Sequence, residues 1–194
     1  MQTEFGRTDT ADTVHKVGLT QGALSADILT IGAVLHSVRL AGVAHDLTVG
    51  RGSVADYQGE LRYHGSLIAP VANRITGAKA VIDGATRRFE ANQAGDITLH
   101  SGEAGTHLKV WRIADAGPAH VTLTLTLSDG EGGFPGTRHV TATYALHDEA
   151  TLRLDIHATT DAPTLFNAVN HSYWNLDGTA DWSGHTLRVS ADHY

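Results

Sequence analysis

The sequence predicts an all-β protein, a large antiparallel β-sandwich. Three observations support this class: hydrophobic residues alternate with a period of two, glycine-rich turns separate the alternating runs, and no segment shows a sustained helical period with capping signals. The chain has 194 residues, of which 41% are hydrophobic. This size and composition predict a globular chain with a sizeable core, and we expect residues 1–194 to form a single domain.

Three runs carry the alternation most clearly. Residues 121–127 (VTLTLTL) place Val and Leu on one face and Thr on the other, and residues 139–146 and 151–158 also alternate with a period of two. Such runs are typical of half-buried antiparallel strands. The polar residues between the last two runs, within 146–150, predict a tight turn and therefore a β-hairpin. Three glycine-rich segments are interpreted as turns between strands: 75–88, 92–96 and 128–136.

The last residues of the chain, 187–194 (LRVSADHY), follow directly on another alternating run and predict a further strand. A strand at an open sheet edge is an aggregation liability, and native proteins usually cover it. We therefore expect the chain to be the N-terminal portion of a longer β-sandwich.

Composition excludes several classes of function. The formal charge is −7 with no run of Lys or Arg, which argues against nucleic acid and membrane surfaces as partners. The chain has no cysteine, so disulfides, thiolate metal sites and a cysteine nucleophile are excluded. Its 13 histidines lack metal-ligand spacing, and we expect no bound metal. The chain shows no signal peptide and no membrane-spanning run, which predicts a cytoplasmic protein.

Polar side chains interrupt the strand pattern in four segments, 63–75, 97–111, 132–146 and 167–176. Arg and Asn present forked hydrogen-bonding groups suited to vicinal hydroxyls, and a ring such as Tyr173 or Trp174 suits the apolar face of a sugar. Histidine exchanges a proton near neutral pH. The set therefore predicts a site for a neutral polyol.

Each of these features also has a structural interpretation. Asn73 and Arg74 could cap a strand, His100 could be a turn histidine, and His171 could be a core histidine satisfied by the flanking amides. Tyr173 and Trp174 are adjacent, so on a strand they would point to opposite faces, and at most one would line a pocket.

The four segments, in this order, resemble the aldose 1-epimerase (galactose mutarotase) family. The resemblance lies in ANRI (72–75), LHSG…VW (99–111), GFPG…VTATYAL (133–146) and NHSYWNLDG (170–178), and it extends from about residue 20 to the end. It implies a β-sandwich enzyme that interconverts the α and β anomers of an aldohexose without metal or organic cofactor. Two departures are Ala69–Pro70, where the family commonly has Gly-Arg, and Ser101, where it commonly has glycine.

By position, the resemblance implies that His171 is the proton donor to the ring oxygen and that His100 belongs to the same catalytic pair of histidines. It implies that Asn73, Arg74, His100 and Tyr173 bind a monosaccharide. The family's catalytic base is a glutamate near the C-terminus of longer chains, and we expect it to lie beyond residue 194. Two alternatives remain open: a non-catalytic carbohydrate-binding β-sandwich, and a related hexose-phosphate epimerase, which would need further Arg or Lys at the pocket.

Overall fold

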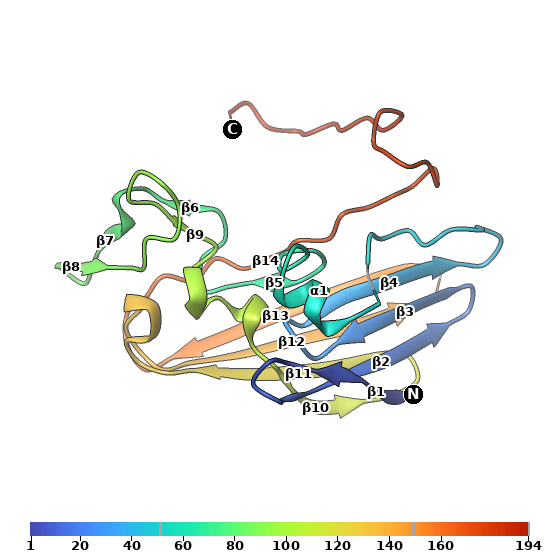
Figure 1. Cartoon of the computed structure of the whole chain (residues 1–194), viewed down its shortest axis with the longest axis horizontal. Helices are drawn as coiled ribbons and strands as arrows, with labels where there is room; N and C mark the ends of the chain where they lie inside the picture. The colour runs from blue at the N-terminus through green and yellow to red at the C-terminus, as the bar shows by residue number, and fades with distance from the viewer. Residues whose placement is uncertain (51, 149, 194) are drawn as a thin grey trace.

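Two four-stranded antiparallel sheets form the body of the protein (Figure 1). The computed structural model describes residues 1–50, 52–148 and 150–193. The first sheet, in spatial order, contains β1 (Gln2–Arg7), β2 (Thr13–Gln21), β3 (Leu24–Leu29) and β4 (Val34–Leu40). The second contains β10 (Arg112–Ala116), β11 (His120–Leu127), β12 (Arg138–His147) and β13 (Thr151–Thr160). Strands that follow one another in sequence are also neighbours in space.

The three strands expected from the alternation are present as β11, β12 and β13, and β12 pairs with β13 as the expected hairpin from Arg138↔Thr160 to His147↔Thr151. Residue 149 of the connecting turn lies outside the described residues. The apolar face of β12 is buried throughout, from Val140 to Leu146, while the alternate residues are more exposed. The period of two in the sequence is therefore a burial pattern.

The core lies between the two sheets, which confirms the predicted all-β sandwich. Leu19 and Ile28 come from the first sheet, Leu123 and Tyr144 from the second, and all four belong to one buried cluster. Trp111 is also part of this cluster, and its backbone N–H donates to Thr30 O at 2.8 Å, which ties the chain entering β10 to the first sheet.

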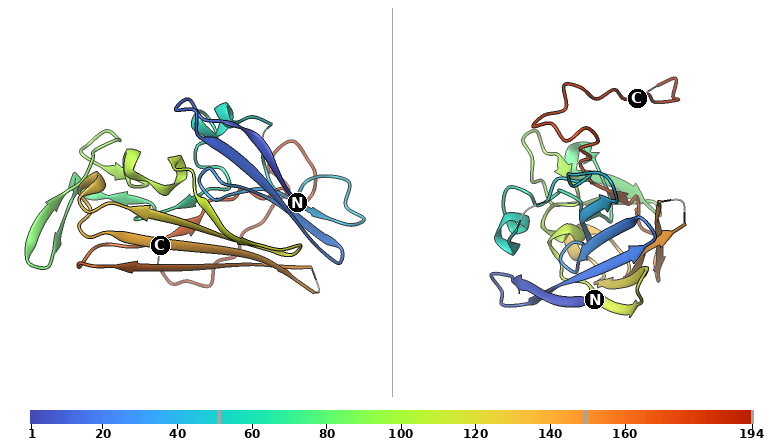
Figure 2. Two further views of the ribbon diagram at one scale, coloured as in Figure 1. Left: turned by 90° about the horizontal axis from the view of Figure 1, so that it is seen from below. Right: turned by 90° about the vertical axis from the view of Figure 1, so that its right-hand side faces the viewer.

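Short strand pairs beside the sandwich carry the polar segments. β5 (Leu67–Ile68) pairs with β14 (Val169–Asn170), and β6 (Arg74–Ile75) pairs with β9 (Thr98–Leu99). β7 (Lys79–Ile82) and β8 (Ala85–Arg88) form a hairpin that projects from one end of the sheets (Figures 1 and 2). Segments about 100 residues apart in sequence are thereby brought together.

The structure differs from the sequence-based expectations in three places. The glycine-rich segment 75–88 is not only a turn, because it contains the β7–β8 hairpin. Residues 54–58 form a short helix, α1 (Val54–Gln58), whose first turn is capped by Ser53. Of the strand expected over residues 187–194, residues 187–193 form none: they are exposed and run outside the two sheets (Figure 2, right), and residue 194 lies outside the described residues. Alternation without a pairing partner does not make a strand.

Helical structure is otherwise limited to single turns among the described residues. These are η1 (Thr76–Ala78), η2 (Gly102–Ala104), η3 (Thr106–Leu108) and η4 (Glu131–Gly133). In the part of the chain that the structure describes, no helix has the length and apolar character needed to cross a membrane.

A buried hydrogen bond of Tyr144 is expected to stabilise the fold. Its hydroxyl donates to Ala33 O at 2.8 Å inside the core, and Ala33 is fully buried. Changing Tyr144→Phe removes only the hydroxyl, which leaves the carbonyl of Ala33 buried without this donor. We expect the free energy of unfolding, measured by urea denaturation, to fall by about 1–3 kcal/mol.

The matched control is Thr141→Val on the outward face of the same strand. We expect it to change the free energy of unfolding by less than about 0.5 kcal/mol. A Tyr144→Phe protein as stable as the parent would show that this hydrogen bond does not anchor the fold.

Candidate active site

A cavity of about 460 Å³ lies where β14 and the segment after it meet the β6–β9 pair. Four of the five residues that the sequence singled out line it: Asn73, His100, His171 and Tyr173. Side chains from residues 73 and 171 therefore share one cavity although they are far apart in the chain. Concave sites with a few convergent polar groups are typical of small-molecule binding.

Asn73 and His100 hold each other through reciprocal hydrogen bonds. The backbone N–H of His100 donates to Asn73 O at 2.9 Å, and the backbone N–H of Asn73 donates to His100 Nδ1 at 3.0 Å. Both residues have left-handed backbone, with φ of 64° and 52°. This conformation is unfavourable for residues other than glycine, and it recurs at functional sites whose surroundings enforce it.

The hydrogen bond to Nδ1 also fixes the tautomer of His100. A backbone N–H can only donate, so Nδ1 is the acceptor and the ring proton of the neutral imidazole resides on Nε2. Burial, the neighbouring His171 and Arg74 lower the pKa of His100 to about 4. At neutral pH His100 is therefore an uncharged ring with an Nε2–H donor.

Ser101 has a left-handed backbone that its side chain stabilises. Its φ is 65°, a conformation that favours glycine. The hydroxyl accepts a hydrogen bond from Val71 N at 2.8 Å and donates to Val71 O at 3.0 Å, and the residue is almost fully buried. These two bonds offset the backbone strain and fasten the turn after β9 to the segment leading into β6.

Arg74, the fifth predicted residue, does not line the cavity. Its Nε donates to Gln93 Oε1 at 2.8 Å, and its Nη1 donates to Asn73 Oδ1 at 3.2 Å. Asn73, with its left-handed backbone, precedes β6, which begins at Arg74, so the two residues do not alternate as neighbours within one strand do. Arg74 instead occupies the amide oxygen of Asn73, which leaves the amide NH₂ as that residue's donor.

His171 is held by its backbone. Its N–H donates to Ser66 O at 2.9 Å and its carbonyl accepts from Gly65 N at 3.1 Å, which extends the pairing of β14 with β5. The His171 ring lies 5.2 Å from that of His100, with an angle of 89° between the two planes. The two imidazoles are thus brought together at right angles in one cavity.

The asparagines beside His171 hydrogen-bond mainly to the backbone of other parts of the chain. Asn170 Nδ2 donates to Gly65 O at 3.0 Å and to the Tyr144 hydroxyl at 3.2 Å, and Oδ1 accepts from Ser172 N. Asn175 bonds to the backbone of Gly178 and Thr179. The amides therefore fix the path of segment 170–179, and the ring of His171 is oriented by its aromatic neighbours.

Tyr63 and His107 belong to this cluster and were missed by sequence reasoning. The Tyr63 ring lies 4.8 Å from that of His100, 4.9 Å from that of His107 and 6.0 Å from that of His171. Burial and then the neighbouring His100 lower the pKa of His107 to about 3. Its Nδ1 is buried without a hydrogen-bond partner among the described residues. The only signal in the sequence was an aromatic residue just ahead of the apolar run 67–72.

Among the described residues that line the cavity there is no Lys or Arg. Of the described residues that line it, none is acidic. Nor do the described residues bring three or more His, Cys, Asp or Glu side chains together in a way that could hold a metal ion. The third polar segment, 132–146, contributes Tyr144, whose hydroxyl accepts a hydrogen bond from Asn170 of the lining. Phe134 of the same segment is buried, with its ring centroid 4.5 Å from that of Phe89. The arrangement is suited to hydrogen bonding with a neutral ligand.

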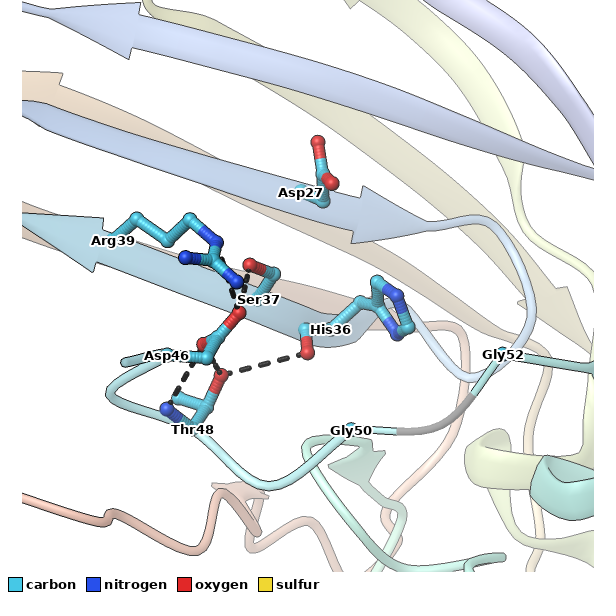
Figure 3. A pocket seen from close by; sticks show the side chains of 8 residues that line it. All are labelled: Asp27, His36, Ser37, Arg39, Asp46, Thr48, Gly50 and Gly52. Atoms are coloured by element: carbon cyan, nitrogen blue, oxygen red, sulfur yellow. Dashed lines mark hydrogen bonds and ion pairs between the residues drawn. The ribbon is translucent and has the colours of Figure 1, made fainter. Parts of the chain in front are cut away.

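A second cavity, of about 500 Å³, lies over β3 and β4 (Figure 3). Its central carboxylate, Asp46, accepts hydrogen bonds from Ser37, Val38 and Thr48 and pairs with Arg39 at 3.6 Å. Burial alone would raise the pKa of Asp46, but these hydrogen bonds outweigh it and lower the pKa. Both carboxylate oxygens of Asp46 are engaged within the protein. We therefore interpret this cavity as a structural feature and not as the functional site.

Comparison with known proteins agrees with the geometry. Residues 15–194 match the family model described as Aldose 1-epimerase. The chain is 34% identical to the aldose 1-epimerase of Escherichia coli (strain K12) over 167 residues, which cover 84% of this chain and 48% of that protein. It is also 34% identical to the maltose epimerase of Levilactobacillus brevis over 186 residues, 92% of this chain and 54% of that protein.

The structural comparison gives the same result. The crystal structure of galactose 1-epimerase from Lactobacillus acidophilus NCFM superposes with a TM-score of 0.80 at 28% identity, covering 91% of this chain and 53% of that one. The chain spans about half the length of the curated relatives it matches. A match over residues 15–194, together with the sandwich and its histidine cavity, shows that the chain belongs to the aldose 1-epimerase family.

Proposed function

We propose that the protein is an aldose 1-epimerase, which interconverts the α and β anomers of an aldohexose. The observation that carries the proposal is the pair of imidazoles, His100 and His171, at 5.2 Å and at right angles in a cavity that Asn73 and Tyr173 also line. Relatives named for aldose, galactose and maltose support an aldose as the substrate class.

The two histidines take different roles in this proposal. His100 is neutral at neutral pH and presents Nε2–H, so it binds a sugar oxygen as a hydrogen-bond donor. Burial, and then the charges of neighbouring side chains, disfavour the charged form of His100, so the proposal does not use His100 as the acid. His171 is then the residue that transfers a proton, and His100 positions the sugar.

The reaction needs an acid and a base. A carboxylate removes the proton from the anomeric hydroxyl, the C1–O5 bond breaks as the C1=O double bond forms, and His171 delivers its proton to O5. Rotation about C1–C2 presents the other face of the aldehyde. O5 then attacks C1 and returns its proton to His171, while O1 regains the proton from the carboxylate, giving the other anomer.

The base is proposed to come from outside residues 1–194. Two observations support this: no acidic side chain is among the described residues that line the cavity, and the relatives are about twice as long as the matched chain. The chain would then contribute the acid and most of the sugar-binding groups.

The same observation favours one alternative, a carbohydrate-binding β-sandwich without catalysis. A cavity with donors, acceptors and an acid but no base could hold a sugar without turning it over. The two functions are separated by measuring sugar affinity and anomer exchange on the same protein.

The central test is polarimetry on freshly dissolved α-D-glucose and α-D-galactose with the complete gene product. Changing His171→Ala removes the proposed acid, and we expect the catalysed rate to fall by about 10²–10⁴-fold, because one positioned acid or base contributes this much. Binding measured by calorimetry with no catalysed change in anomer ratio would identify the binding function instead.

The matched control is His157→Ala, an exposed histidine on the outward face of β13. We expect its rate to equal that of the parent. A His171→Ala protein with the parent's rate would exclude His171 as the acid.

The second test concerns the charge of His100. We expect its imidazole to stay neutral with the proton on Nε2 down to about pH 4, compared with about 6.5 for an unperturbed histidine. Long-range ¹H–¹⁵N NMR reports both tautomer and pKa. A midpoint near 6.5, or a proton on Nδ1, would contradict the proposed hydrogen-bond donor.

The low pKa values also predict a direction for stability. Between about pH 6.5 and 4 the unfolded chain binds protons on His100 and His107 that the folded chain does not. The contribution of these two neutral histidines to the free energy of unfolding is therefore fully present above pH 6.5. It falls as the pH is lowered through this window. Urea denaturation at a series of pH values measures it, and His107→Leu is expected to reduce the slope if it folds stably.

A further inference from the structure

The two proposed histidines lie on opposite edges of one extended segment, residues 67–73. On one edge β14 pairs with β5, and His171 follows β14 directly. On the other edge the backbone N–H of His100 donates to Asn73 O at 2.9 Å. The two imidazole rings meet at a distance of 5.2 Å. Their relative position therefore depends on how the two neighbouring chains are fastened to segment 67–73.

Thr106 fastens the first half of the edge that faces His100. In an extended segment every second residue directs its backbone groups to the same edge, where a neighbouring strand usually supplies their partners. Here Thr106 Oγ1 accepts from Ala69 N at 2.9 Å and donates to Leu67 O at 2.5 Å. The backbone N–H of Thr106 donates to Ala69 O at 2.9 Å. Trp111 Nε1–H donates to Thr106 O at 3.3 Å, which ties this residue to the core.

Ser101 and His100 continue the row along the same edge. Ser101 Oγ accepts from Val71 N at 2.8 Å and donates to Val71 O at 3.0 Å. His100 Nδ1 accepts from Asn73 N at 3.0 Å. The side chains of Thr106, Ser101 and His100 thus bond in turn to residues 67 and 69, to 71 and to 73, and we call these three side chains the side-chain ladder.

We propose that Ser101 and Thr106 are positioning residues for the cavity: their hydroxyls hold the turn after β9 against segment 67–73 and thereby place the ring of His100 relative to that of His171. This inference rests on the proposed function and adds to it two residues that do not line the cavity. They act through His100, which is the last member of the ladder and does line the cavity.

Burial gives the hydrogen bonds of the ladder their energetic weight. Ser101 is 1% exposed and Thr106 is 0% exposed. Removing either hydroxyl leaves backbone N–H and C=O groups of segment 67–73 without that partner inside the protein, which is costly. The arrangement in which every one of these bonds is formed is therefore strongly preferred, and it allows His100 one position.

The last bond separates the ladder from ordinary buried hydroxyls. Most buried hydroxyls only satisfy nearby backbone groups. The ladder differs because it ends on an imidazole nitrogen, and the hydrogen bond to that nitrogen places the ring proton of His100 on Nε2. A shift of the ladder is therefore expected to change both the place and the tautomer of His100.

The test removes the two hydroxyls one at a time from the complete gene product. Thr106→Val keeps the shape of the side chain, and Ser101→Ala keeps the Cβ atom. We expect each to lower kcat/KM for anomer exchange, measured by polarimetry, by about 10-fold, because a small misplacement of a substrate-binding group is costly. Long-range ¹H–¹⁵N NMR is expected to show His100 changing from a single Nε2–H tautomer to a mixture of both.

Two further variants control for an effect on stability alone. Thr106→Ser keeps the hydroxyl and is expected to keep most of kcat/KM and the single tautomer of His100. Thr30→Val makes the same change at a threonine that is 1% exposed and whose Oγ1 accepts from His15 N at 2.9 Å in the first sheet. We expect Thr30→Val to lower the midpoint of urea denaturation as Thr106→Val does, while kcat/KM and the tautomer stay those of the parent.

The outcomes distinguish the ladder from the proposed function. Ladder variants that keep the parent's kcat/KM and its Nε2–H tautomer overturn the inference, and so does an equal loss of kcat/KM in Thr30→Val. A parent without catalysed anomer exchange contradicts the proposed function, and the tautomer of His100 in the variants then tests the ladder by itself.

Hydrogen exchange on the parent protein tests the ladder where a variant does not fold. The amides of Ala69 and Val71 donate to the two hydroxyls, and we expect them to exchange at least about 10²-fold more slowly than exposed amides. Exchange of these amides as fast as that of an exposed amide overturns the ladder.

Discussion

The hydroxyl of Tyr144 connects the core of the sandwich to the cavity. Burial raises the pKa of Tyr144, so the phenol stays protonated and donates to Ala33 O, while its oxygen accepts from Asn170 Nδ2. The same amide also bonds to Gly65 O and so places the residue before His171 against the chain ahead of β5. The position of the proposed acid is therefore set by a hydrogen bond that lies inside the hydrophobic core, where an unpaired polar group would be costly.

The opposite wall of the cavity depends on backbone strain that is offset locally. Asn73, His100 and Ser101 all have left-handed backbone, and each takes part in a hydrogen bond between the β6 and β9 segments. This wall fixes His100 as a neutral donor, because its Nδ1 is occupied by a backbone N–H and its charge is disfavoured by burial. The proposed roles of the two histidines use this geometry: His100 is the uncharged hydrogen-bond donor, and the proton transfer is assigned to His171.

Sequence reasoning found the parts that depend on local pattern. The strands β11 to β13 follow from alternation, and Asn73, His100 and His171 follow from polar residues at strand ends. It missed relations between distant segments: Tyr63 contacts three histidines from two other segments, and Trp182 contacts Tyr173 across a turn. It also expected a strand over residues 187–194, and it gave no sign that Arg74 bonds to Gln93 and Asn73, because neither a pairing partner nor a contact with a distant side chain is encoded in local periodicity.

The charge of the cavity decides between a neutral sugar and a sugar phosphate. A phosphate ligand requires cationic donors that face it, ideally an arginine fork. Arg74 is the nearest candidate by sequence, but its guanidinium is bonded to Gln93 and Asn73 and does not line the cavity. Arg62 is engaged in an ion pair with Glu103, at 3.9 Å, and is not among the described residues that line the cavity. With His100 held neutral, the described lining residues offer amides, imidazoles and a phenol, which match hydroxyl groups. These contacts support the proposal of an unphosphorylated aldose, in place of a hexose phosphate, as the ligand of this cavity.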